Sequence, residues 1–276
     1  LQADYVDTRT TTLLAKDAQN THNSLATIFD HVCDMHPDKT AVQCNEQQLS
    51  FAQLREKSER YAALLQTQLS GNGHIIGVYL SRSVALTQTI WAIIKSGNVY
   101  LPLDPEHPTQ RIAQILANSQ ASLVLTDEHH AEAAKALAND CDVNVLNIDQ
   151  ADPGSRTFLP VIMNADSPAY MIYTSGSTGT PKGIRLSHRP LIDMSRNLTE
   201  VLATPADHNF LAITTVSFDI SLLELISATL NANTIVLADA EQAKDPFLLE
   251  PLLARVQTVQ TTPSRLRLLL ECLGDN

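Results

Sequence analysis

The chain has 276 residues, of which 44% are hydrophobic, enough for the core of one large domain or two small ones. Its 30 acidic side chains outnumber the 19 basic ones, and the resulting formal charge of −11 opposes binding to nucleic acid or to an anionic membrane surface. The same charge leads us to expect small-molecule and protein partners. No run of eighteen apolar residues and no basic leader followed by an apolar stretch occurs, so we expect a cytoplasmic protein.

Residues 1–23 differ in composition from the rest of the chain. They are rich in Thr, Asp, Gln and Asn without sustained hydrophobic periodicity, which predicts a linker or leading arm. Ser24 can then cap a helix whose apolar positions recur at helical spacing until Pro37. A strand over Thr40–Cys44 and an amphipathic helix over residues 51–69 follow. We therefore expect the folded domain to begin at residue 24.

Strands and helices alternate along the remaining chain. Up to residue 148, the pattern predicts strands at 75–80, 99–103, 122–126 and 143–148 and helices at 84–95, 110–118 and 128–138. Residues 149–168 carry three prolines and a glycine, which predicts an irregular connection. Beyond it, strands are predicted at 169–173, 183–187, 210–214, 234–237 and 258–261, and helices at 190–202, 221–230, 246–256 and 263–273. Apolar strands alternating with helices indicate an α/β fold with layered sheets flanked by helices.

The connection between the strands at 169–173 and 183–187 has the composition of a phosphate-binding loop. Residues 173–183 read Tyr-Thr-Ser-Gly-Ser-Thr-Gly-Thr-Pro-Lys-Gly, and the three glycines allow positive φ angles, so that several N–H groups can face one anion. The loop is not a P-loop, because its lysine follows a proline. A solvated Ser/Thr/Gly linker is the alternative interpretation. The candidate phosphate ligands are Thr174, Ser175, Gly176, Ser177, Thr178, Gly179 and Lys182.

A second candidate site is the sequence Phe218-Asp219-Ile220-Ser221. Asp219 follows an apolar strand and precedes a helix, which is where α/β proteins present groups to ligands, and its carboxylate could pair with an ammonium ion. We expect this carboxylate to be partly buried. The alternative is purely structural: Ser221 and Glu224 have the spacing of a capping box, Asp219 suits a helix N-terminus, and Phe218 could pack in the core.

Cysteine and histidine show no metal-binding or disulfide pattern. The four cysteines, at positions 33, 44, 141 and 272, include no C-x-x-C pair, and the nine histidines include no H-E-x-x-H arrangement. We therefore expect reduced thiols and no protein-bound metal site.

Several motifs, in order, resemble the core motifs of AMP-forming adenylate enzymes, the superfamily of nonribosomal peptide synthetase adenylation domains, acyl-CoA synthetases and luciferases. They are the phosphate loop, Leu49–Leu54, Lys95–Pro105 with Pro108 and Arg111-Ile112, and Phe218–Ser221. Within them, Tyr-Leu-Pro-Leu-Asp-Pro and Phe-Asp-x-Ser resemble the amino-acid adenylation domains most. The resemblance begins near Ser24 and covers nearly all of the following chain. It implies part of the large N-terminal subdomain of the adenylate-forming fold.

The resemblance implies activation of an amino acid by ATP and Mg²⁺, giving aminoacyl-AMP and pyrophosphate, and loading onto the phosphopantetheine of a carrier protein domain beside neighbouring synthetase domains. By the same resemblance, the loop would hold the β- and γ-phosphates, Asp219 the α-amino group, and Phe218 would lie beside the reacting carboxylate. Side-chain selectivity would depend in part on Ile220, Leu223 and Gln260. With Asp219, these residues resemble the pattern associated with glycine, and aliphatic groups that fill a pocket floor suit a substrate without a side chain.

The family's later motifs, including its adenine and ribose contacts and a catalytic lysine, have no counterpart here. The resemblance therefore implies that residues 24–276 are an incomplete N-terminal core subdomain, without an assigned catalytic residue and inactive in isolation. Two alternatives stay open: an acyl- or aryl-CoA ligase, which has no use for an acidic amine ligand, and a non-catalytic scaffold fragment.

Overall fold

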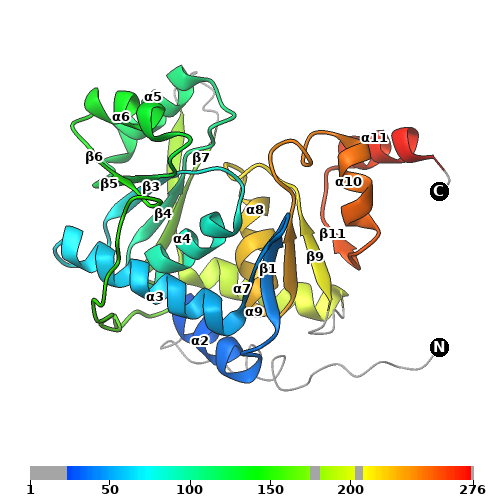
Figure 1. Cartoon of the computed structure of the whole chain (residues 1–276), viewed down its shortest axis with the longest axis horizontal. Helices are drawn as coiled ribbons and strands as arrows, with labels where there is room; N and C mark the ends of the chain where they lie inside the picture. The colour runs from blue at the N-terminus through cyan, green and yellow to red at the C-terminus, as the bar shows by residue number, and fades with distance from the viewer. Residues whose placement is uncertain (1–23, 175–180, 203–207, 275–276) are drawn as a thin grey trace.

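The computed structural model describes residues 24–174, 181–202 and 208–274, so the predicted leading arm at 1–23 lies outside the described residues. Its strands form two sheets (Figure 1). The six-stranded sheet has the order β6-β5-β3-β4-β7-β8. Its strands are β3 (Ile75–Tyr79), β4 (Val99–Pro102), β5 (Leu123–Thr126), β6 (Asn144–Asn147), β7 (Pro168–Thr174) and β8 (Lys182–Ser187). All neighbours are parallel except β7 and β8, which form an antiparallel pair.

The five-stranded sheet has the order β11-β9-β10-β1-β2. Its strands are β1 (Thr40–Cys44), β2 (Gln47–Ser50), β9 (Asn209–Ala212), β10 (Thr234–Leu237) and β11 (Thr258–Val259). The helices are α2 (Leu25–Met35), α3 (Phe51–Gln68), α4 (Val84–Lys95), α5 (Thr109–Ser119), α6 (Ala131–Asn139), α7 (His188–Leu202), α8 (Ile220–Leu222), the π-helix η2 (Leu223–Ser227), α9 (Ala228–Leu230), α10 (Pro246–Leu253) and α11 (Pro263–Leu273).

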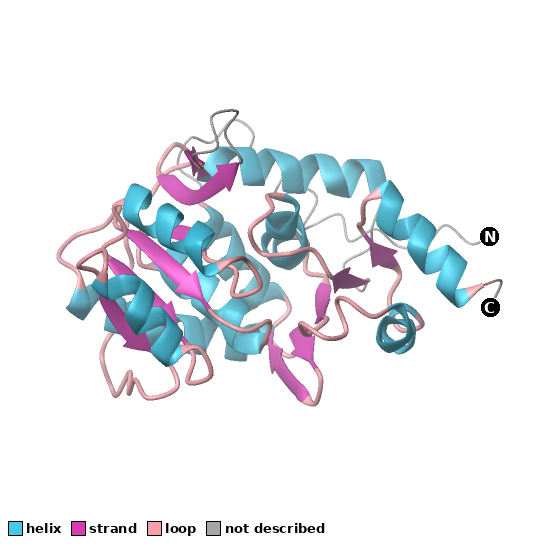
Figure 2. Ribbon diagram, turned by 90° about the horizontal axis from the view of Figure 1, so that it is seen from above, coloured by secondary structure: helices cyan, strands magenta, loops and turns pink. Residues whose placement is uncertain are grey.

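Alternating strand residues build three hydrophobic cores. In β10, Ile235 belongs to the central core between the sheets, whereas Val236 packs with α10 and α11 on the outer face. In β5, Leu125 belongs to the central core and Val124 packs with α5 and α6. Helices α2, α3, α4 and α7 contribute to the central core. The result is a helix–sheet–helix–sheet–helix arrangement, and Figure 2 shows the strands running between helices. The predicted α/β class with layered sheets is confirmed.

Most element boundaries differ from the predicted ones by a few residues, and two differences have physical causes. The strand β2 was not predicted, because its residues 47–50 are mostly polar; it forms as the partner of β1 across a turn in which Asn45 has a φ of 52°. The predicted helix over 221–230 is a composite that begins at Ile220 and widens to a π-helix at Leu223–Ser227.

Helix α2 packs through an aromatic pair. Phe29 stacks on Trp91, with ring centroids 4.0 Å apart, and both rings are fully buried. Beside them, the Lys95 ammonium is buried and pairs with the partly exposed carboxylates of Asp30 and Glu59. Because Trp91 is the chain's single tryptophan, its fluorescence reports on the central core.

Arg82 joins the two sheets. It follows β3 of the six-stranded sheet and donates to the carbonyl oxygens of Ala212 (2.8 Å), Thr214 (2.6 Å) and Ala238 (2.7 Å), which follow or end strands of the other sheet. Burial lowers the pKa of its guanidinium. Three carbonyl dipoles from the five-stranded sheet therefore hold one cation of the six-stranded sheet.

The four cysteines lie apart from one another in the fold. All four are free, and Cys33 and Cys44 are buried. Burial raises the pKa of Cys33 to about 12 and that of Cys44 to about 11, so both are poor nucleophiles at neutral pH. A separate finding is that no helix within the described ranges is long and apolar enough to cross a membrane.

The buried imidazole of His188 makes stability depend on pH. Its Nδ1 accepts a hydrogen bond from the Leu25 N–H (3.2 Å), and burial lowers its pKa from 6.5 to about 4. The unfolded chain takes up this proton near pH 6.5, whereas the folded chain does so only near pH 4. Lowering the pH from about 6.5 to about 4 is therefore expected to remove about 3 kcal/mol of stability through this residue.

Urea denaturation at several pH values, followed by Trp91 fluorescence, measures this effect. We expect His188→Gln to flatten the loss of stability between pH 6.5 and 4, whereas His129→Gln, at an exposed position, keeps the parental slope. Equal slopes for the His188 variant and the parent would contradict the assignment.

Candidate functional site

The candidate phosphate loop connects the antiparallel strands β7 and β8. Thr174 ends β7 and pairs with Lys182, the first residue of β8, and both side chains are exposed. The predicted ligands Ser175, Gly176, Ser177, Thr178 and Gly179 lie outside the described residues. The described ends of the loop thus present one hydroxyl and one ammonium group side by side. The two strands predicted on either side of the candidate loop are confirmed.

Gly183 has a different role from the expected one. We expected it to adopt a positive φ, but it is not among the described glycines that do. Instead it allows close packing: a Cβ at this position would overlap Met171 Cε and lie 2.7 Å from Tyr173 Cζ. The Tyr173 hydroxyl in turn lies 2.8 Å from Asn118 Oδ1 on α5. A side chain at this position would therefore shift the end of Met171 and the ring that contacts α5.

Asp219 lies at the carboxyl end of the five-stranded sheet, where a loop leads from β9 into α8. Its carboxylate accepts a hydrogen bond from the Ile220 N–H (2.9 Å), as an N-cap, and the side chain is exposed rather than partly buried as expected. Phe218 is 56% exposed, so the core-packing alternative for this ring is wrong. Both groups are therefore accessible to a ligand.

The proposed capping box is also wrong. Ser221 lies inside the composite helix, and its hydroxyl is 2.6 Å from the carbonyl oxygen of Phe218 and 3.1 Å from that of Val216. Glu224 is fully buried and accepts from Thr214 through the backbone N–H (2.9 Å) and the hydroxyl (2.6 Å). Burial raises the pKa of Glu224 against the effect of these hydrogen bonds. Ser221 and Glu224 thus shape the loop that carries Asp219.

The predicted selectivity residues lie near the same sheet edge. Ile220 and Leu223 are partly buried and lie on α8 and at the start of η2. Gln260 follows β11, which runs parallel to β9, so both connections leave the same edge of the sheet. Its Oε1 is shielded from solvent and has no hydrogen-bond partner among the described residues. An unpartnered acceptor of this kind is a candidate ligand contact.

The two candidate sites approach each other through Tyr170. This residue belongs to β7, which leads into the phosphate loop. Burial, and secondly the charge of Asp219, raise the pKa of Tyr170 to about 12. The charge of Asp219 thus acts on a side chain of the strand that leads into the phosphate loop.

A cavity of about 310 Å³ lies between the carboxyl ends of the two sheets, and no predicted site residue lines it. Its polar lining includes Arg82, Asp104, Thr215, Lys244 and Arg265. Arg265 donates to the carbonyls of Ile213 (3.3 Å) and Ala243. Sequence reasoning missed this cluster, although Asp104 belongs to the Leu-Pro-Leu-Asp-Pro motif.

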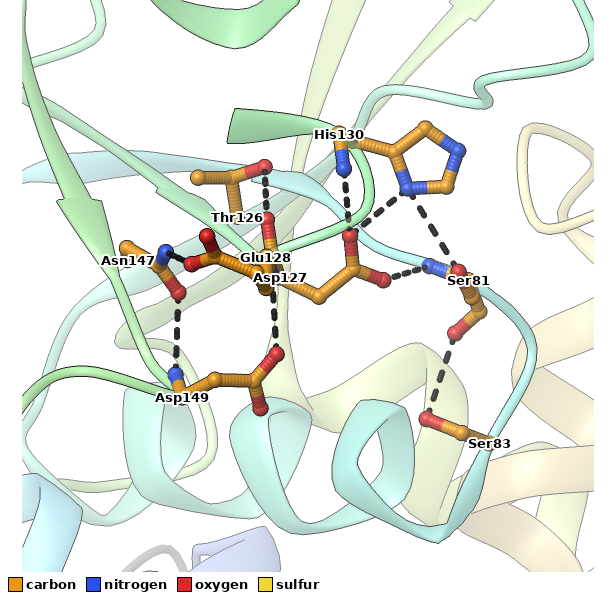
Figure 3. A network of polar contacts seen from close by, with 8 residues as sticks. All are labelled: Ser81, Ser83, Thr126, Asp127, Glu128, His130, Asn147 and Asp149. Carbon is orange, nitrogen blue, oxygen red and sulfur yellow. Dashed lines mark hydrogen bonds and ion pairs between the residues drawn. The ribbon is translucent and has the colours of Figure 1, made fainter. Parts of the chain in front are cut away.

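At one side of the cavity, Ser81, His130 and Asp127 form a polar network (Figure 3). His130 Nδ1 lies 2.7 Å from Asp127 Oδ1 and 3.4 Å from Ser81 Oγ. Burial would raise the pKa of Asp127, but hydrogen bonds from Ser81 and His130 outweigh it and lower the pKa. Because one ring nitrogen makes both contacts, the imidazole cannot relay a proton from the serine to the aspartate. The network fixes the turn after β5.

Metal-ligating side chains do not cluster in the described ranges: no group of three or more His, Cys, Asp or Glu residues there could hold an ion.

Comparisons with known proteins give a consistent picture. The profile of the family described as AMP-binding enzyme matches residues 29–276. Tyrocidine synthase 3 of Brevibacillus parabrevis is 34% identical over 256 residues, which are 91% of this chain and 4% of the relative. The dimodular nonribosomal peptide synthase of Bacillus subtilis is 33% identical over 249 residues, 87% of this chain and 10% of the relative. The chain thus spans a tenth or less of these two relatives.

Solved structures share the fold. The N-terminal subdomain of Klebsiella oxytoca NpsA matches with a TM-score of 0.79 and 24% identity, over 91% of this chain and 64% of that one. AB3403, a four-domain nonribosomal peptide synthetase solved with AMP and glycine, matches with a TM-score of 0.78 and 25% identity, over 91% of this chain and 18% of that one.

Proposed function

The chain belongs to the AMP-binding enzyme family. We propose that it activates an amino acid with ATP as part of a nonribosomal peptide synthetase. One observation carries the proposal: Asp219 presents an accessible carboxylate at the N-cap of α8, on the connection that leaves the carboxyl end of β9, where α/β proteins bind their ligands. An adenylating enzyme needs its acid substrate next to the triphosphate. An acidic side chain at that position selects acids that carry an ammonium group.

The reaction needs the chain to hold two substrates in line. The amino acid's carboxylate oxygen forms a bond to the α-phosphorus of ATP, and the bond from that phosphorus to the bridging oxygen breaks, releasing pyrophosphate. Thr174, Lys182 and the loop residues Ser175–Gly179 would bind the β- and γ-phosphates. Mg²⁺ bound with the triphosphate would neutralise charge that develops on the leaving group. Asp219 would orient the substrate through its α-ammonium, with Phe218 beside its carboxylate.

The second half of the proposed function is thioester formation. The phosphopantetheine thiol of a carrier protein domain would attack the aminoacyl carbonyl, AMP would leave, and the thiol proton would pass to solvent. None of the described residues is assigned to this step.

Glycine is the proposed substrate, or another small amino acid. Ile220 and Leu223 contribute aliphatic bulk near Asp219, and the unpartnered Gln260 acceptor lies at the same sheet edge. Aliphatic side chains that fill the floor of a pocket would suit a substrate without a side chain. AB3403, whose structure contains AMP and glycine, supports this choice by likeness.

ATP–pyrophosphate exchange across a panel of acids tests the proposal, using the natural polypeptide that contains this chain. We expect exchange with glycine, less with alanine, little with phenylalanine, and none with acetate or benzoate, which lack an amine. Comparable exchange with acetate or benzoate would place the protein among acyl- or aryl-CoA ligases. No exchange with any acid would favour a scaffold.

A further inference from the structure

The loop at residues 215–221, which carries Phe218 and Asp219, is bonded to the opposite sheet. Thr215 belongs to this loop, and its hydroxyl donates to Asp104 Oδ2. Asp104 follows β4 of the six-stranded sheet and is only 6% exposed. Its other oxygen accepts from the Glu106 N–H (3.0 Å), which fixes the carboxylate. A charged acceptor in this setting makes a strong hydrogen bond.

A second contact runs parallel to the first. Ser217 Oγ lies 3.3 Å from His107 Nε2, and the His107 N–H donates to the Asp104 carbonyl (3.0 Å). The hydroxyls of Thr215 and Ser217 are themselves 3.3 Å apart. One turn, residues 104–107, thus holds two hydroxyl side chains of the loop.

Hydrogen bonds within the loop connect this attachment to Phe218 and Asp219, the candidate substrate-binding residues. The Phe218 N–H donates to the Thr215 carbonyl (3.1 Å), and the Ser221 hydroxyl donates to the Phe218 carbonyl (2.6 Å). A shift of Thr215 therefore moves the backbone of Phe218 and, one residue later, Asp219. The strand β4, which precedes the turn, pairs with β7, the strand that leads into the phosphate loop.

We propose that Asp104 and His107 are positioning residues that fix the 215–221 loop relative to the phosphate loop by holding the hydroxyls of Thr215 and Ser217. The inference rests on the proposed function for its kinetic consequence. If the loop moved freely against β7, the carboxylate of a bound amino acid would be misplaced relative to the α-phosphorus. Misplacement on the order of 1 Å can cost about a hundredfold in rate.

Thr215→Val is the sharpest test, because it replaces the hydroxyl by a methyl group of similar size. We expect about a tenfold fall in kcat/KM for the amino acid in ATP–pyrophosphate exchange, with the KM for ATP within about twofold of the parent, because the loop that carries Asp219 loses one hydrogen bond to a charged acceptor. Thr215→Ser, which keeps the hydroxyl, should restore the parental value. Asp104→Asn should resemble Thr215→Val. Glu106→Gln, in the same turn, loses only an exposed ion pair to Lys244 and should behave as the parent.

Amide hydrogen exchange of residues 215–221, without substrates, gives a readout that does not depend on activity. We expect faster exchange in Thr215→Val and parental exchange in Thr215→Ser and Glu106→Gln. Trp91 fluorescence in urea confirms that each variant is folded. Parental amide hydrogen exchange together with a parental kcat/KM for the amino acid in folded Thr215→Val would overturn the positioning role. If the parent activates no acid, the proposed function fails, and amide exchange alone then decides whether the turn fixes the loop.

Discussion

Replacing Asp219 by alanine is expected to lower kcat/KM for the amino acid about a hundredfold or more in ATP–pyrophosphate exchange, with little change in the KM for ATP, because this carboxylate is the proposed partner of the substrate's ammonium group. The carboxylate is exposed without substrate, so the loss arises when the ammonium group binds without its counter-charge. A site that is built to pair the substrate's charge binds the substrate much less well when the protein's own charge is missing.

Asp219→Asn separates this electrostatic role from helix capping. Asparagine caps helix N-termini as well as aspartate does, so the bond to the Ile220 N–H can persist while the charge is lost. We expect Asp219→Asn to lose nearly as much activity as the alanine variant. Asp245→Asn, at the N-cap of α10, is the matched control and should retain parental exchange. Full activity in Asp219→Asn would show that the residue serves only as a cap.

Replacing Arg82 by methionine is the change expected to cost most stability, about 3 kcal/mol. Methionine keeps much of the apolar stem but leaves three carbonyl oxygens, at Ala212, Thr214 and Ala238, without their donor. Urea denaturation followed by Trp91 fluorescence measures the loss.

Arg60→Met is the control for the Arg82 variant, because Arg60 is exposed on α3. Its effect should stay within about 0.5 kcal/mol. An Arg82 variant that unfolds at the same urea concentration as the Arg60 variant would show that the three hydrogen bonds contribute no net stability. Arg82→Lys should fall between them, since an ammonium lacks the planar fork of the guanidinium.

The helices and strands predicted most accurately from the sequence are those whose apolar pattern fits only one kind of element. The helix at Val84–Lys95 and the strand at Thr234–Leu237 have the predicted boundaries, because each is largely apolar and bounded by polar or turn residues. The strand β2 escaped prediction, since three of its four residues are polar and its pairing with β1 depends on the turn at Asn45. Local patterns also say nothing about which strands share a sheet.

In the candidate site, too, residues within a motif could be predicted from the sequence, whereas contacts between distant residues could not. The places of Asp219 and of the hairpin ends in the fold could be predicted, because each belongs to a motif that directly follows or precedes a strand. The roles of Ser221 and Glu224 could not: their spacing suits a capping box, yet their partners are Phe218 and Thr214. Asp104 and Thr215 are joined only in the folded chain, where the edges of two sheets meet.

The position of β1 has a consequence for synthesis on the ribosome. β1 lies between β2 and β10, and Val42 pairs with Ile235, so one of its two neighbours is translated long after it. The described strands β3 to β8 are complete by Ser187, before β9 begins. The six-stranded sheet can thus assemble while the β1–β2 hairpin still has an open edge. Closing that edge awaits β10, and until then the nascent chain exposes a pairing surface that a chaperone can shield.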